Sequence, residues 1–244
     1  MDQALERRVQ DAAEQLRASG FIGLLAPLIR EVWERNVARF DGPAGDTVRL
    51  LGLQSAENLV VRLGSLRKES AWVETQVMIS FHQNSMLVTC GELRIHLMKA
   101  PQQSRRRPDW HHDFPWANQS NARAESARQV DETFRAPAEF PGMEPMFPAD
   151  GLGEFGDPAD IREFFIVWAG EFSEDPLTAG WMVIPTLRKM QVLSYEPLWF
   201  DERGESGSVK TKSGPKAPSS VDGEPEVAIT IKAAPREAGQ NRVG

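Results

Sequence analysis

The chain has 244 residues, of which 41% are hydrophobic and 26% charged, a composition typical of a globular protein that argues against global disorder. A net charge of −7 argues against a surface that is basic throughout, although a local basic patch stays open, and the lone Cys90 rules out an internal disulfide. No apolar stretch is long enough to span a membrane, and MDQALERRVQ lacks the apolar region of a secretory signal. We therefore expect a cytoplasmic protein without membrane contact.

Helical periodicity dominates the region 1–68. Apolar residues recur every three or four positions over 3–18 and again over 22–40, where Pro27 is placed in the first turn or at a bend. The spacing predicts two amphipathic helices, and we expect them to pack as a hairpin.

Residues 46–68 also have a helical pattern, which we interpret as two pieces. Ser55 is a reasonable N-cap for the second piece. Gly52 weakens the expectation that the two pieces are continuous.

The period then changes from about 3.6 residues to 2, and residues 72–200 are predicted to be rich in sheet. Alternating apolar residues predict strands at 77–82, 86–90 and 92–97. We expect an antiparallel meander that places one face on the core. The polar face of its third strand carries three candidate binding residues, which are Glu92, Arg94 and His96.

A helix is predicted at 121–134, followed by further strands. The run 164–169 is continuously apolar and predicts a fully buried strand. It forms a predicted antiparallel hairpin with 181–184. A last strand at 192–199 contains Pro197, which suits the edge of a sheet.

Apolar residues become scarce after residue 202. Residues 203–224 are rich in Gly, Ser, Lys and Pro, which is the composition of a flexible linker. The C-terminal peptide 225–244 contains the β-prone segment 226–233, EVAITIKA, which can add to its own sheet or to a partner's exposed edge. The predicted organisation is a single α+β domain at 1–202, with a helical hairpin packed on a mainly antiparallel sheet, then a disordered linker and this peptide.

The loop RRRPDWHHDFPW supplies most of the candidate binding residues. Its arginines and tryptophans could hold an anionic partner, because guanidinium groups pair with acidic groups and indole rings stack on bases. A protein partner is favoured over nucleic acid, which stays open. The predicted binding surface comprises Glu92, Arg94, His96, Arg105, Arg106, Arg107, Trp110 and Trp116.

A metal site is the alternative, because all four histidines fall within the region 82–113. Imidazole and carboxylate groups are common ligands of divalent metals, but no HxxxH, HxH or CxxC spacing directs two of them at one point. The candidate ligands are His82, His96, His111, His112 and Asp113.

The order helix, three strands, helix, strand offers an analogy with restriction-nuclease-like domains, whose metal site needs an acidic-x-Lys pair on a strand. That pair is missing, since Glu92 and Lys99 lie seven residues apart. We therefore expect a non-enzymatic interaction or regulatory protein without a cofactor, which binds its partner through the 92–116 region and the C-terminal tail. The alternative is a metal-dependent hydrolase, with a nuclease among the candidates.

Overall fold

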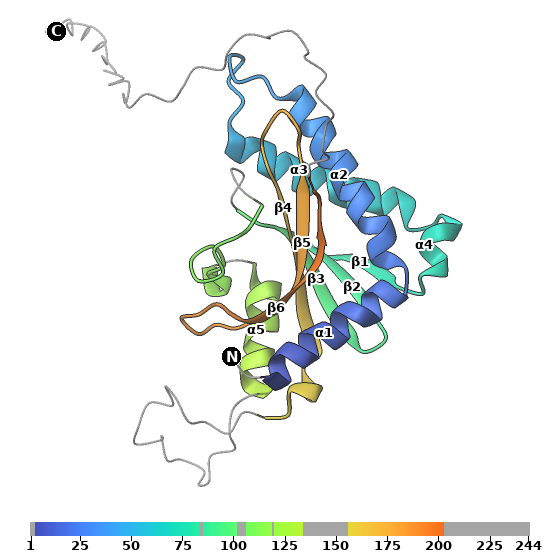
Figure 1. The fold of residues 1–244 in the computed structure, drawn as a ribbon, viewed down its shortest axis with the longest axis vertical. Helices are drawn as coiled ribbons and strands as arrows, with labels where there is room; N and C mark the ends of the chain where they lie inside the picture. The colour runs from blue at the N-terminus through green and yellow to red at the C-terminus, as the bar shows by residue number, and fades with distance from the viewer. Residues whose placement is uncertain (1–2, 83–84, 102–105, 119, 134–155, 203–244) are drawn as a thin grey trace, which may run out of the picture. The chain divides into compact units, whose positions relative to one another are not determined.

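The computed structural model describes residues 3–82, 85–101, 106–118, 120–133 and 156–202 (Figure 1). The predicted linker and the β-prone segment 226–233 lie outside the described residues. In the described ranges, no helix has both the length and the apolar character that crossing a membrane requires.

The helical N-terminal region begins with α1 (Gln3–Ala18), which has the predicted bounds. Its apolar stripe is buried, as the amphipathic pattern predicted. Gly20 has a φ of 80°, which favours glycine and allows a sharp turn into α2 (Phe21–Arg39). Pro27 lies in the second turn of α2 rather than the first.

The next helix, α3 (Val48–Leu66), is continuous, so the prediction of two pieces is wrong. Thr47 is its N-cap, whereas Ser55 is buried within the helix and donates a 2.7 Å hydrogen bond to the Leu51 carbonyl. Because this bond stays inside the helix, Ser55 does not interrupt it. The short helix α4 (Ser70–Glu74) follows and leads into the sheet.

The Thr47 cap allows a direct test of stability. Its Oγ1 accepts a 3.2 Å hydrogen bond from the Leu50 N–H, which has no partner within the helix. Thr47→Ala is expected to lower the free energy of unfolding by about 1 kcal/mol in urea denaturation. Ser65→Ala is the control, because the Ser65 hydroxyl bonds to a carbonyl within α3 and caps nothing. Equal stability of the two variants would contradict the capping role.

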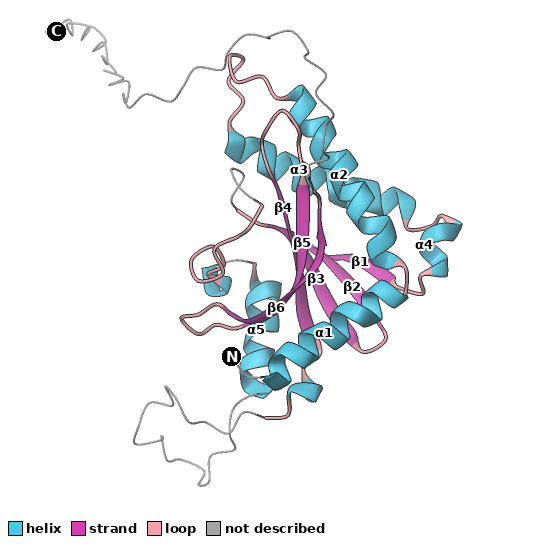
Figure 2. Ribbon diagram, viewed as in Figure 1, coloured by secondary structure: helices cyan, strands magenta, loops and turns pink. Residues whose placement is uncertain are grey.

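The sheet has six strands in the order β1-β2-β3-β4-β5-β6 (Figure 2). Neighbours are antiparallel except for β3 and β4, which are parallel and are connected through α5 (Asn121–Thr133). The predicted meander, hairpin and edge strand with Pro197 are confirmed. The strands are β1 (Met78–His82), β2 (Ser85–Cys90), β3 (Leu93–Lys99), β4 (Glu163–Gly170), β5 (Thr178–Pro185) and β6 (Val192–Phe200).

Both faces of the central strands are covered, so this α+β domain has three layers. The N-terminal helices pack on one face and form the larger core with side chains such as Ile95 and Ile166. The second core lies on the opposite face, where α5 and the loop 106–118 cover Phe165 and Val167. The expectation that only one face of the meander lies on the core is therefore wrong for β3.

Candidate binding site

The basic loop is fixed to the ends of β4 and β6 by Arg106. The side chain of Arg106 is only 12% exposed, and its Nε lies 3.1 Å from a carboxylate oxygen of Glu171, just after β4. The same guanidinium donates to the Asp201 carbonyl and lies 4.1 Å from the ring centroid of Phe200. Arg106 thus holds the fold together, while the neighbouring Arg107 is exposed.

Asp201 anchors the same end of the sheet. Its carboxylate accepts hydrogen bonds from Arg30 on α2 and from both the N–H and the hydroxyl of Thr178. Burial alone would raise the pKa of Asp201, but these hydrogen bonds lower it. The cluster therefore joins α2 to the ends of β5 and β6.

The predicted tryptophans belong to an aromatic cluster over the second face of the sheet. Trp116 is 1% exposed, and its ring centroid lies 4.5 Å from that of Phe165 on β4. Trp110 is half-buried and stacks on Tyr195 and Phe114 with centroid distances of 4.7 and 5.4 Å. Trp116 is therefore closed to a partner, while part of Trp110 stays accessible.

His96 is buried in a polar chain that crosses from β3 to α5 and β4. Its Nε2 lies 2.8 Å from the Ser126 hydroxyl, which donates a 2.8 Å hydrogen bond to Glu163. Glu163 also forms a 3.0 Å ion pair with Arg94. The single hydroxyl proton of Ser126 goes to Glu163, so Nε2 of His96 carries a proton and donates to Ser126. A serine nucleophile would need the opposite direction, with its proton going to the histidine.

Burial is the main cause of the pKa shifts of His96 and Glu163 in this hydrogen-bonded group. Burial lowers the pKa of His96 to about 4, and the charges of Arg123 and Arg94 lower it as well. Burial also raises the pKa of Glu163, against the effects of Ser126 and Arg94. The imidazole is therefore neutral near pH 7, and its buried Nδ1 has no hydrogen-bond partner among the described residues.

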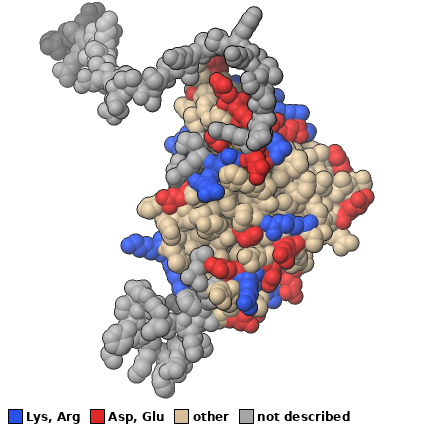
Figure 3. Space-filling model, in the orientation of Figure 1, with Lys and Arg blue, Asp and Glu red and all other residues tan. Residues whose placement is uncertain are grey.

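The predicted surface is divided between the two ends of the sheet. Glu92, which is paired with Arg162 at 2.9 Å, and Arg94 lie at the start of β3. Arg106 and Arg107 lie beyond the other end of β3, a strand length of roughly 20 Å away. Arg105 lies outside the described residues. Among the atoms coloured in Figure 3, positive and negative side chains are interspersed on the face shown and form no continuous basic patch.

The candidate metal ligands do not assemble in the described part of the chain. No group of three or more His, Cys, Asp or Glu side chains there could hold a metal ion. His96 is buried beside Ser126, whereas His111 and His112 are exposed on a turn that Asp113 and Asp109 stabilise. The side chain of His82 is outside the described part.

The two groups considered for the nuclease analogy, Glu92 and Lys99, do not lie together. Lys99 ends β3 with its ammonium 5.0 and 5.5 Å from the ring centroids of Trp33 and Trp168, and burial lowers its pKa to about 8. Glu92 lies at the opposite end of the same strand, in its ion pair with Arg162. The ammonium group of Lys99 thus makes cation–π contacts with the two indole rings.

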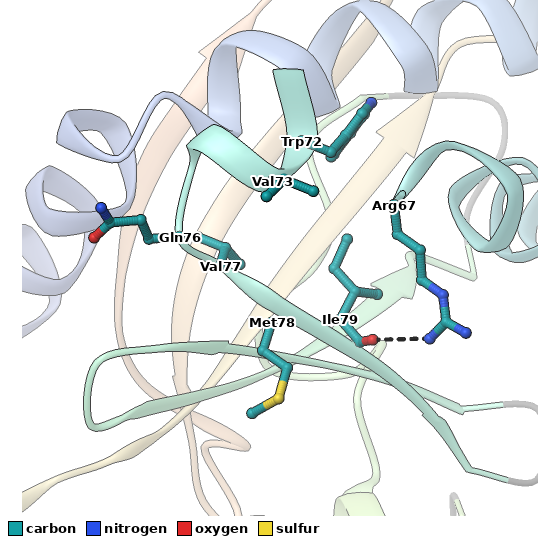
Figure 4. A pocket seen from close by; sticks show the side chains of 7 residues that line it. All are labelled: Arg67, Trp72, Val73, Gln76, Val77, Met78 and Ile79. Atoms are coloured by element: carbon teal, nitrogen blue, oxygen red, sulfur yellow. Dashed lines mark hydrogen bonds between the residues drawn. The ribbon is translucent and has the colours of Figure 1, made fainter. Parts of the chain in front are cut away.

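A surface that the sequence interpretation missed lies along β1, which is one edge of the sheet. A pocket of about 360 Å³ lies between this edge, α4 and the end of α3 (Figure 4). We call it the β1 edge groove. Val73 and Met78 beside it are 61% and 64% exposed, although both are apolar. The groove is lined by Arg67, Trp72, Val73, Gln76, Val77, Met78 and Ile79.

Every second residue of β1 directs its backbone N–H and C=O groups toward this groove. Arg67 donates a 3.2 Å hydrogen bond to the Ile79 carbonyl, as Figure 4 shows. The N–H and C=O of one residue point to the same side of an antiparallel strand, and this side alternates along it. The backbone N–H and C=O groups of Ile79 and Phe81 therefore point away from β2. In the described ranges, no strand pairs with this outer side.

Comparison of the chain with protein-family models, curated proteins and solved structures finds no significant match.

Proposed function

We propose that the protein is a non-enzymatic interaction protein that binds an extended segment of a protein partner along the outer edge of β1. The β1 edge groove is the observation that carries this proposal. An added strand would pair with the outward-facing backbone of Ile79 and Phe81, and alternate side chains would enter the groove beside Val73. Backbone pairing supplies affinity in this mode, while the groove supplies selectivity.

The exposed apolar side chains support the same proposal. Edge strands of sheets are commonly protected by charge, proline or a covering element, because their unpaired backbone groups recruit other strands. At β1 the described protection is Arg67, which bonds to the Ile79 carbonyl and lies over the Phe81 ring at 5.2 Å. Arginine on a flexible side chain can move aside when a strand arrives.

The 92–116 region remains part of the proposal through the residues that a partner can reach. Arg107, His111 and His112 are exposed on the loop, and Glu92 and Arg94 are exposed at the start of β3. An acidic partner segment could contact Arg107 in addition to the groove. The hydrolase alternative has no support in the described residues, because its ligands and its acidic-x-Lys pair are not brought together.

A peptide-display selection tests the proposed surface. The full-length protein would be panned against random 12-residue peptides, and the selected peptides measured by isothermal titration calorimetry. We expect the selected peptides to have alternating apolar residues. We expect Val73→Asp to lower the affinity for these peptides at least about 10-fold, because it places a charge beside the groove.

Val61→Asp is the matched control, because Val61 is a similarly exposed valine on α3 that does not line the groove. We expect it to leave affinity unchanged. If Arg107→Ala removes binding while Val73→Asp does not, the binding surface is the 92–116 region and the proposal for β1 is wrong.

A further inference from the structure

The outer face of α3 exposes neighbouring apolar side chains. Leu50 and Leu53 are 49% and 56% exposed, whereas Leu51, Leu59 and Leu63 on the inner face of the helix are buried in the core. Single exposed leucines are common on protein surfaces, so this face needs a second observation before a partner can be inferred.

The second observation is the arrangement of charge on the same helix. Arg49, Leu53 and Glu57 are spaced four residues apart and so form one row along α3. Arg49 and Glu57 are both exposed, and neither has an ion-pair partner among the described residues. They lie about 12 Å apart along the helix axis, which is too far for them to pair with each other. The row therefore carries opposite charges at equal distances on either side of Leu53.

This row is complementary to a reversed copy of itself. Rows of residues four apart commonly pack against each other where two helices cross, with an angle of about 50° between the helix axes. If two α3 helices cross in opposite directions at Leu53, Arg49 of each copy lies beside Glu57 of the other. The two Leu53 side chains meet at the centre, and Leu50 flanks them. A crossing at Glu57 would instead bring two carboxylates together, so the charges favour the crossing at Leu53.

We propose that two copies of the chain form a two-fold symmetric dimer through α3, in which the row of Arg49, Leu53 and Glu57 packs against the same row of the other copy. A two-fold axis uses the same surface twice, so each dimer contains two Arg49–Glu57 ion pairs around an apolar centre. The dimer carries two β1 edge grooves, so a partner with two extended segments binds it more tightly than a partner with one. That consequence rests on the function proposed for the groove, whereas the dimer itself does not.

Sedimentation velocity of the full-length protein at concentrations between about 2 and 500 µM tests the dimer. We expect the wild type to change from monomer to dimer as its concentration rises. Arg49→Glu and Glu57→Arg each convert both ion pairs into like-charge contacts, so each is expected to raise the dissociation constant at least about 10-fold. Because both positions are exposed, we expect circular dichroism to show that both variants fold.

An equimolar mixture of Arg49→Glu and Glu57→Arg is the decisive sample. In a heterodimer of these variants, the two substituted positions face each other with opposite charges, and so do the two unsubstituted positions. We therefore expect the mixture to recover the dimer with an affinity within about threefold of the wild type. Mixing cannot recover a dimer that was lost through misfolding, so recovery is specific to the proposed pairing.

Arg7→Glu is the matched control, because Arg7 is exposed on α1 and the substitution changes the net charge as Arg49→Glu does. We expect it to leave the dimer unchanged, and we expect the same of Val73→Asp, so failure at the groove is distinguishable from failure at α3. A monomeric wild type overturns the proposal and leaves this face to a different protein. A dimer that survives both charge reversals, or a mixture that stays monomeric, overturns it as well.

Discussion

Replacing Trp116 by alanine is expected to lower the free energy of unfolding by about 3–5 kcal/mol. The side chain is 1% exposed, packs on Phe114 and Phe165, and donates from its indole N–H to the Gln191 carbonyl. Truncation therefore leaves a cavity in the second core and removes one of the two hydrogen bonds of the Gln191 carbonyl, which keeps the bond from the Thr186 N–H. Urea denaturation followed by circular dichroism measures the loss.

Trp110→Ala is the control for the same change in a less buried residue. Trp110 stacks on Tyr195 and Phe114 but stays half-buried, so its loss is expected to be clearly smaller. If Trp116→Ala kept the stability of the wild type and lost a partner, the sequence-based prediction of a binding role for Trp116 would be restored. The structure assigns Trp116 to the interior.

Lowering the pH from 7 to 4 is expected to remove about 3 kcal/mol of stability through His96 alone. The pKa of this imidazole falls from an ordinary 6.5 to about 4 in the folded protein, mainly because the side chain is buried. Between these values the unfolded chain binds a proton that the folded protein does not, so stability falls as the pH falls. Below about pH 4 both states are protonated and the contribution changes no further.

The measurement is the difference in unfolding free energy between the wild type and His96→Gln from pH 7 to pH 4. Glutamine keeps an N–H that can reach Ser126 but does not titrate. The comparison is needed because Glu163 acts in the opposite direction: its raised pKa lets the folded protein gain stability as this carboxyl becomes protonated. Parallel curves for the two proteins would contradict the assignment to His96.

Local signals predicted most of the secondary structure. The bounds of α1 follow from its apolar stripe, and β4 follows from a continuous apolar run. The prediction failed at Ser55, because a serine within a helix can bond to the preceding turn as readily as it can cap a helix, and only packing decides. The parallel pairing of β3 with β4 joins segments more than 60 residues apart, which no local pattern encodes.

The candidate site was harder to predict, because polarity and position alone do not reveal what covers a strand. His96 was placed on a polar face, but α5 and the loop 106–118 bury that face and pair the imidazole with Ser126. The continuous apolar run of β4 was the available signal that both faces of the central sheet are covered. Arg106 gave no such signal, since its partner Glu171 is 65 residues away.

The contact between α1 and the strands β5 and β6 has a consequence for the order in which the chain can fold. A ribosome adds about 5–20 residues per second, so roughly 9–36 s separate the synthesis of α1 from that of β6. During this interval the apolar stripe of Leu5, Val9 and Leu16 lacks the strands that later bury it. A nascent chain therefore offers this stripe to chaperones until its last described strand has left the exit tunnel.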